Sequence, residues 1–292
     1  MSGARFILSL DCEGKWGIAD HLGPRDHELL SDARLQRAYR DIIALLDRHE
    51  VPATFAVVGL FVEPKDALAS LPHSDLAEQL PYTRAAMQAL AAGEFDGWCG
   101  NWLRAMLGEA HEWASHGVTH TPYDQMTADD VRLEHALVSP VAGQTFIFPR
   151  NRIGHLDVLA ELGVTGYRLA ACRGRIARLM GEFQMRTPSE ADPLQLPHAP
   201  VAIPAGHFVN WKSGGRKLVP VAVSRKRAAA MLDHAVKTGG VVHYWTHPEN
   251  VATAPDTLSV LSAIVQEAAI RARRGEIRIL TQADYVAEQI VA

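Results

Sequence analysis

The stretch Arg5-Phe-Ile-Leu-Ser-Leu-Asp-Cys-Glu13 is the one from which the fold can be worked out. Its run from Phe6 to Leu10 is short and mostly apolar and leads into polar residues, which is typical of a buried β-strand. Residues i and i+2 of a strand share one face and lie about 6–7 Å apart along it. The carboxylates of Asp11 and Glu13 are therefore expected on one face, where both can reach the same site from slightly different depths.

Strand signals alternate with helix signals along the rest of the chain. This alternation favours an α/β fold with a mainly parallel sheet, open or closed into a barrel. The count of about seven strands favours a barrel, in which functional residues lie at the carboxyl ends of the strands. We expect strands near residues 5–11, 52–59, 112–116, 145–148, 166–170, 240–245 and 277–280, and helices near residues 32–49, 83–92, 127–136, 153–162, 224–237 and 258–273.

The chain is expected to form a single domain over residues 1–292, because it contains no repeat, low-complexity tract or obvious linker. Residues 64–110 are expected to be an insertion near the mouth of the fold, since a helix-like stretch is followed there by a Gly/Trp-rich segment. Residues 172–222 are rich in Pro and Gly and are expected to be mainly loops.

Composition and charge exclude several classes of protein. The 292 residues are 48% apolar and 21% charged, which excludes collagen, coiled coils and disordered chains. The net charge of −4 provides no basic field to attract nucleic acid or anionic lipid. Cys12, Cys99 and Cys172 are odd in number and widely spaced, so no disulfide framework is expected. No apolar run is long enough for a signal peptide or a transmembrane helix, and we expect a cytoplasmic protein.

Three further strands also end in polar residues of the types that a metal hydrolase needs. The spacing of His116 and His120 suits two ligands of one ion if the chain turns there, because an extended strand would place them about 13 Å apart. Arg150 lies at the rim of the next expected strand, where a proline turns the chain, and His247 ends a later strand. Each residue alone is readily explained as a surface or core residue, but their joint position at strand ends is not expected by chance.

In their order, these motifs resemble those of the polysaccharide deacetylases, metal-dependent carbohydrate esterases that act on N-acetylated glycans. The similarity covers roughly residues 5–285, and it implies a distorted, incomplete (β/α) barrel. The matching motifs are Ser9-Leu-Asp-Cys-Glu13, Ser115-His-Gly-Val-Thr-His120, Phe148-Pro-Arg150 and Trp245-Thr-His247-Pro.

One residue departs from the family pattern. Cys12 stands where the family usually has a metal-binding Asp, but some members place the second carboxylate one residue later, as Glu13 does here. Cys12 would then point to the opposite face and pack as a small apolar residue. Two alternatives stay open at this point: Asp11 and Glu13 exchange their roles, or the thiolate of Cys12 is a ligand.

The resemblance also implies roles for the site residues. Glu13, His116 and His120 would hold one divalent ion, most simply Zn²⁺, although Co²⁺ or Fe²⁺ would accept the same ligands. Asp11 would be the general base, and His247 the general acid that protonates the departing amine.

Other residues would support this chemistry. Arg150 would pair with Asp11 and keep it ionised, and a backbone N–H in the turn after Arg150 would complete the oxyanion site. The nearest candidate for the family motif that tunes the catalytic His is Phe208-Val-Asn-Trp211, which has Asn where the family has Asp. Candidates for contact with the substrate are Trp16, Asn151, Trp211 and Trp245.

We therefore expect a hydrolase that cleaves a linear C–N amide bond and removes an N-acetyl or other N-acyl group from an amino sugar or a glycan-biosynthesis intermediate. Two alternatives use the same site: hydrolysis of a small cyclic or linear amide, as in allantoinase-like relatives, or removal of a formyl group. A third belongs to another class, an inactive relative that only binds a glycan.

Overall fold

The computed structural model of the chain describes residues 3–71, 81–136, 144–171, 185 and 200–291. Cys172, part of the expected insertion and part of the expected loop region 172–222 lie outside these residues.

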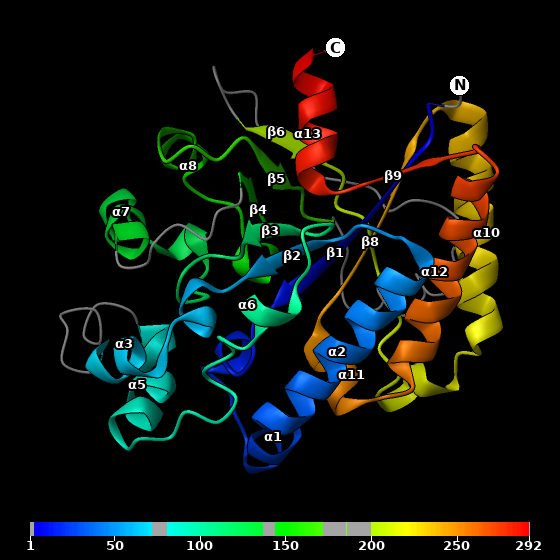
Figure 1. Cartoon of the computed structure of the whole chain (residues 1–292). Helices are drawn as coiled ribbons and strands as arrows, with labels where there is room; N and C mark the ends of the chain where they lie inside the picture. Colours follow the sequence, from blue (N-terminus) through cyan, green and yellow to red (C-terminus); the bar gives the residue numbers. More distant parts are fainter. Residues whose placement is uncertain (1–2, 72–80, 137–143, 172–184, 186–199, 292) are drawn as a thin grey trace.

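Nine strands of the described chain form one sheet in which every pairing is parallel. Its order is β6-β5-β4-β3-β2-β1-β8-β7, and β9 pairs with the first residues of β1. The sheet curls into an open half-barrel (Figure 1), which confirms the expected fold class. The strands are β1 (Arg5–Cys12), β2 (Thr54–Val57), β3 (Glu112–Ser115), β4 (Thr145–Phe146), β5 (Gly166–Arg168), β6 (Val201–Ile203), β7 (His207–Phe208), β8 (Val241–Thr246) and β9 (Arg278–Leu280).

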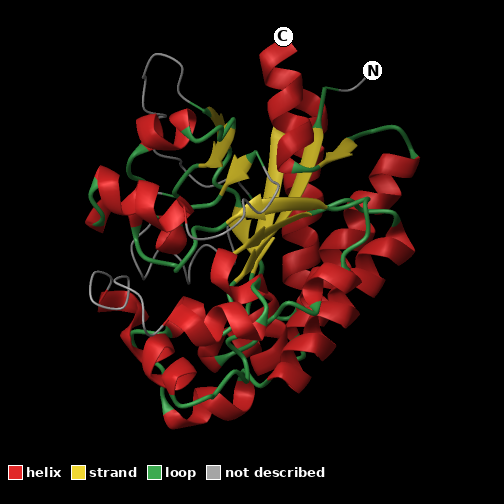
Figure 2. Ribbon diagram, turned by 60° about the vertical axis from the view of Figure 1, so that its left-hand side comes forward, coloured by secondary structure: helices red, strands yellow, loops and turns green. Residues whose placement is uncertain are grey.

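Helices surround the sheet (Figure 2), and α2, α10 and α12 pack side by side along one flank (Figure 1). The helices are α1 (Pro24–Leu29), α2 (Asp32–His49), α3 (Lys65–Ser70), α5 (Arg84–Ala91), α6 (Leu103–Met106), α7 (Ala128–Ala136), α8 (Leu156–Glu161), α10 (Val221–Thr238), α11 (Pro248–Thr253), α12 (Thr257–Arg273) and α13 (Gln282–Val291). Among the residues described, no helix combines the length and the apolar composition needed to cross a membrane.

Helix α2 shows how the sequence pattern produces these elements. Leu35, Tyr39, Ile42 and Leu46 recur at helical spacing, and all four are buried. This apolar stripe packs the helix onto the sheet and its neighbours. The helix ends where Glu50 adopts a left-handed conformation with a φ of 55°.

Strand β1 lies in the middle of the sheet and is buried on both faces. Phe6, Leu8, Leu10 and Cys12 point into the main hydrophobic core under the helices. The alternate residues face the inside of the half-barrel, where Ile7 packs against the apolar side chains of β6, β9 and α13. Because strand residues alternate between faces, Ser9 and Asp11 follow Ile7 on this inner face, up to the carboxyl end of the strand. The inner face of β1 therefore leads directly to the polar cluster described next.

Candidate active site

Side chains from four strands meet at one rim of the half-barrel. Asp11 and Glu13 lie at the end of β1, His116 follows β3, Arg168 ends β5 and His247 follows β8. Parallel strands place their carboxyl ends on the same rim, which is why these distant parts of the sequence come together. Asp11, Glu13 and His247 line a cavity of about 600 Å³ beside this rim.

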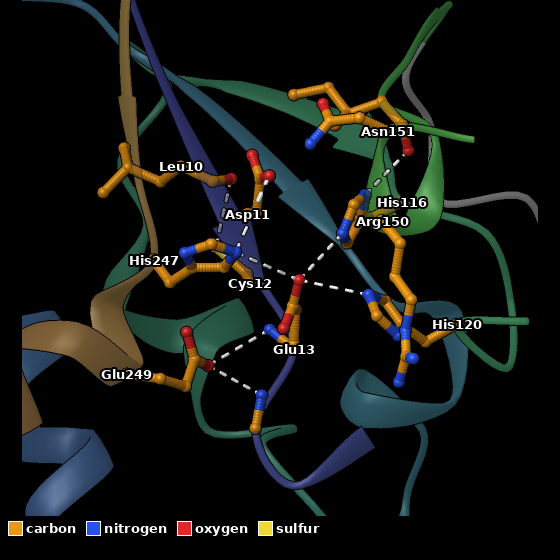
Figure 3. Close-up of polar contacts among 12 residues, drawn as sticks. Leu10, Asp11, Cys12, Glu13, His116, His120, Arg150, Asn151, His247 and Glu249 are labelled. Atoms are coloured by element: carbon orange, nitrogen blue, oxygen red, sulfur yellow. Dashed lines mark hydrogen bonds and ion pairs between the residues drawn. The ribbon is translucent and has the colours of Figure 1, made fainter. Parts of the chain in front are cut away.

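Glu13 is at the centre of the cluster (Figure 3). Its Oε1 lies 3.0 Å from Nε2 of His116 and 3.1 Å from Nε2 of His120, and all three residues are at least nine-tenths buried. Burial by itself raises the pKa of Glu13, but the neighbouring imidazoles of His120, His247 and His116 together hold that pKa well below its usual range. Glu13 is therefore a buried carboxylate facing two imidazole nitrogens.

The donor set fits a divalent cation. The backbone oxygen of Ile147 lies 2.7 Å from Nδ1 of His116, and because a carbonyl only accepts, that nitrogen carries a proton. In the neutral ring, Nε2 then holds its lone pair against the Glu13 oxygen, an arrangement that a cation between them stabilises. Carboxylate and imidazole are ligands that Zn²⁺ accepts, and ligand atoms of Glu13, His116 and His120 lie within 4.8 Å of one another.

The two histidines are brought together by a turn rather than by a helix. Gly117, with a φ of 72°, turns the chain directly after β3, and His120 has a left-handed φ of 63°. Glu134 of α7 supports this turn from behind, because its carboxylate accepts hydrogen bonds from the backbone N–H, at 2.7 Å, and the hydroxyl of Thr119. The ring centroids of the two histidines are 5.0 Å apart as a result.

Asp11 is held by Arg168. Nη1 and Nη2 of Arg168 donate to Oδ1 and Oδ2 of Asp11, both at 2.7 Å, and each residue is 2% exposed. Burial raises the pKa of Asp11, but the Arg168 guanidinium and the nearby His116 and His247 together lower it by more. The net shift of this pKa is therefore downward. The sequence analysis missed Arg168, although an arginine inside an apolar strand is itself a signal, since a buried guanidinium needs a carboxylate partner.

The expected pairing of Arg150 with Asp11 is wrong. Arg150 instead forms an ion pair with Asp20, and its guanidinium lies on the His120 side of the cluster (Figure 3). The reason is local, because Arg150 and Asn151 have left-handed φ values of 56° and 55° that turn the chain away from Asp11. The expected oxyanion donor also fails, since the N–H groups of the two residues after Arg150 donate to Phe148 and Pro149 within the turn.

His247 lies on the opposite side of Glu13. Its Nε2 is 3.4 Å from Oε1 of Glu13 and 3.9 Å from Oδ2 of Asp11. Burial lowers the pKa of His247, but the Glu13 and Asp11 carboxylates raise it by more than burial lowers it. The resulting pKa is about 9. Asn210, the expected tuning residue, donates to the carbonyl of Arg216 and does not contact His247 in the contacts described. The amide beside Nδ1 of His247, at 3.2 Å, belongs to Asn250.

Glu249 is a further buried carboxylate that the sequence analysis missed. Its Oε1 accepts the backbone N–H groups of Glu13, at 3.1 Å, and Gly14, at 2.6 Å, together with the hydroxyl of Tyr39. Burial and the charge of Glu13 raise the pKa of Glu249 to about 7. Its place two residues after His247 was the available signal.

The remaining candidate residues differ in their access to the cavity. Asn151, Trp211 and Trp245 line it. Trp16 does not fit its expected role, because it is 1% exposed, packs edge-on against Trp98 and donates its N–H to the carbonyl of Trp98. Cys12 lies in the hydrophobic core on the other face of β1, which argues against a thiolate ligand.

Comparison with known proteins agrees with the motifs. Residues 24–137 match the family model described as polysaccharide deacetylase, whereas no curated protein sequence matches the chain. A Mycobacterium smegmatis protein assigned as a polysaccharide deacetylase has a TM-score of 0.58 at 15% identity, over 98% of this chain and 90% of that one. The Puue allantoinase has a TM-score of 0.57 at 12% identity, again over 98% and 90% of the two chains.

At these identities the two solved structures establish a common fold, and the family model covers the segment from α1 to α7 that contains the His116–His120 turn. The segment from α1 to α7 is therefore similar to the polysaccharide deacetylases, and the chain as a whole shares the fold of these two solved structures.

Proposed function

We propose that this chain is a metal-dependent hydrolase that removes an N-acetyl or other N-acyl group from an amino sugar or a glycan-biosynthesis intermediate. The observation that carries the proposal is the convergence of the His116 and His120 nitrogens on Glu13, beside an Asp11 carboxylate that Arg168 keeps ionised. A cavity of about 600 Å³ has the size of a small-molecule site, which supports a substrate no larger than a short oligosaccharide.

Glu13, His116 and His120 would hold the ion, with Zn²⁺ as the first candidate and Co²⁺ or Fe²⁺ as others. When bound, the ion supplies Lewis acidity to the reacting water and carbonyl. Asp11 is favoured as the base over an exchange of roles with Glu13, because both of its oxygens are already engaged by Arg168.

Asp11 and His247 carry out the two proton transfers of the reaction. Asp11 is ionised at neutral pH and takes a proton from the attacking water, since a carboxylate has lone pairs beyond the two that Arg168 occupies. His247, whose pKa is about 9, is protonated at neutral pH and donates its proton to the departing amine. The amide C–N bond breaks, and the products are a carboxylate and a free amino sugar.

The test is a panel of N-acetylated sugars, nucleotide sugars and ureides incubated with the metal-loaded protein, with release of amine and acetate as the readout. Amine release from a ureide and not from a sugar would replace the substrate class with a small amide. Full activity after removal of the metal would overturn the metal-dependent scheme.

Two variants separate metal binding from turnover. His116→Ala is expected to lose both the metal and activity, because it removes a ligand. Asp11→Asn is expected to retain the metal and lose activity, because the amide cannot accept the proton. Elemental analysis and the amine assay measure the two properties independently. A wild-type protein that binds a glycan but neither metal nor any amide substrate would instead be the inactive relative.

A further inference from the structure

Below the candidate active site, buried polar side chains from three strands form a continuous hydrogen-bonded chain. It runs from Asp11 through Arg168 and Ser9 to His243, and it ends at the carbonyl of Pro204. All four side chains are at most 2% exposed. We propose that Ser9 and His243 are positioning residues that fix the orientation in which Arg168 holds the Asp11 carboxylate. The proposal rests on the role of Asp11 in the proposed function.

The guanidinium of Arg168 is fixed at both of its edges. Besides the two bonds to Asp11, Nη1 donates to Oγ of Ser9 at 3.2 Å and Nη2 donates to Oδ1 of Asn151 at 3.1 Å. The four Nη hydrogens therefore all have acceptors, and the ring of Trp245 lies against the guanidinium face at 4.5 Å. Removal of Ser9 frees one edge of this group while leaving its bonds to Asp11 possible.

The direction of every proton in the chain follows from its two ends. The Pro204 carbonyl, 2.5 Å from Nδ1 of His243, only accepts, so Nδ1 carries the proton. Nε2 of the neutral ring is then the acceptor, and Ser9, 2.9 Å away, must donate its hydroxyl proton to it. The Ser9 oxygen is thereby left to accept from Arg168. His243 thus sets the orientation of the Ser9 hydroxyl, which in turn sets that of Arg168.

This hydrogen-bonded chain of side chains also crosses the interior of the half-barrel. Strand β5, which carries Arg168, is separated from β1 by β4, β3 and β2 in the sheet order. Ser9 and Asp11 lie on the inner face of β1, and the neighbouring strand β8 supplies His243. Space for the imidazole depends on Gly206, because a Cβ there would lie 2.9 Å from Cγ of His243. The contact is therefore built by several elements rather than by one loop.

The protonation state of His243 agrees with this role. Burial and the positive charge of Arg168 lower the pKa of His243 to about 3, although the Pro204 carbonyl and Asp11 act in the other direction. The ring therefore stays neutral over the pH range in which a hydrolase of this kind works, and the hydrogen bonds keep one direction.

A double-mutant cycle tests the proposal. Ser9→Ala is expected to lower kcat by about tenfold, with KM and metal content unchanged. In an Arg168→Ala background the same change is expected to have no further effect, because Ser9 acts through Arg168. Ser224→Ala is the matched control, since Ser224 is also fully buried and its hydroxyl has no hydrogen-bond partner in the described structure. Equal effects of Ser9→Ala in both backgrounds would overturn the proposal.

Two further measurements keep the test decisive if Arg168→Ala does not fold. Arg168→Lys then replaces it in the cycle. His243→Gln, which can still donate to Pro204 and accept from Ser9, is expected to retain most of kcat, whereas His243→Leu is expected to lose as much as Ser9→Ala. Equal kcat for the two His243 variants would contradict the positioning role.

The tautomer of His243 provides a readout that needs no substrate. Nitrogen NMR of the imidazole is expected to show the proton on Nδ1, with an Nε2 signal that shifts in Ser9→Ala and not in Ser224→Ala. A proton on Nε2 would overturn the proposed direction of the chain. A protein with the expected tautomer that hydrolyses no amide would refute the proposed function alone.

Discussion

Arg168 and Arg150 illustrate how residues of one type near one cavity acquire different roles. Arg168 is buried, and its two nitrogens match the two oxygens of Asp11, which is the strongest form of an arginine–carboxylate pair. Arg150 is partly exposed and pairs with the surface residue Asp20. A buried pair depends on both partners, whereas a solvated pair contributes little.

Replacing these arginines by lysine is therefore expected to have unequal effects. Arg168→Lys keeps the charge but loses the paired donors, so kcat is expected to fall by at least about tenfold while the metal content is unchanged. Arg150→Lys is expected to have the smaller effect. Steady-state kinetics with elemental analysis measures both, and the reverse order of effects would return the Asp11-orienting role to Arg150.

Gly17 is the residue against which the Glu13 carboxylate packs. A Cβ at Gly17 would lie 1.7 Å from Oε2 of Glu13, so Gly17→Ala must displace that side chain. We expect the affinity for the metal to fall by about tenfold or more, as it does when the support of a ligand is removed. Gly108→Ala is the control, because nothing lies within 4 Å of a Cβ at that position. Calorimetric titration with Zn²⁺ measures both, and equal affinities would contradict this reading of Gly17.

At the scale of elements, helix α7 supports the turn that carries His120. Its N-terminus is fixed by reciprocal hydrogen bonds between Thr127 and Asp130, in which each residue's side chain accepts from the backbone N–H of the other. Its buried Glu134 then accepts from Thr119 and from the hydroxyl of Tyr123. A helix with no residue among the candidate ligands therefore fixes the position of one of them.

Removal of Glu134 is expected to loosen this turn. Glu134→Ala leaves the buried Thr119 N–H without its acceptor and should weaken metal binding, although Glu134 itself is not a candidate ligand. Glu134→Gln retains a carbonyl oxygen for that N–H and is expected to bind metal more tightly than the Ala variant. Calorimetric titration compares the two, and identical affinities would show that the turn holds its shape without Glu134.

The elements predicted from the sequence are those with a helical periodicity or an apolar run of their own, and they include the short strands β4, β5 and β9. Strand β1 and helices α2 and α12 are long, so their patterns predict them correctly. Strands β6 and β7, with three and two residues, were missed because they lie among or beside the Pro and Gly residues of 172–222, a composition that predicts loops, and their pairing is defined by neighbours in the sheet. Helix α13 was missed as well.

Site residues were predictable where their spacing in the sequence fixes the distance between their side chains. The positions of Asp11 and Glu13 at the end of β1 and of the His116–His120 pair follow from local geometry, and the structure brings these residues together. The partner of Asp11 was not predictable in this way, because Arg168 lies 157 residues away in the sequence and meets it only through the curl of the sheet.

At the scale of the whole molecule, the two ends of the half-barrel carry different polar networks. The carboxyl end holds the candidate active site. At the other end, Glu112 accepts hydrogen bonds from Thr54, at 2.7 Å, from Thr145 and from the backbone N–H of Ala283 at the start of α13. The second network ties three strands to the last helix, so stability and chemistry depend on separate residues.

Buried histidines link the stability of the whole molecule to pH. His111, His120, His135 and His243 all have a pKa lowered by burial, and for His243 the value is about 3, against 6.5 for an unperturbed histidine. Between these two values the unfolded chain takes up a proton at His243 that the folded chain does not. The free energy of unfolding must therefore fall as the pH falls through this window. His247, with its pKa of about 9, has the opposite effect, which is confined to higher pH.

Urea unfolding of the metal-free protein between pH 6.5 and pH 5 measures this linkage, in a window that lies above the titration of most carboxylates. One proton corresponds to a slope of about 1.4 kcal/mol per pH unit, so His243→Gln is expected to flatten the wild-type slope by up to that amount. His27→Gln, at an exposed position, is the control for the same substitution outside the buried chain of hydrogen bonds. If His243→Gln keeps the wild-type slope, His243 takes up its proton in the folded state as well. The ring would then not be neutral, and the proposed direction of the buried hydrogen bonds, which depends on a neutral ring, would be wrong.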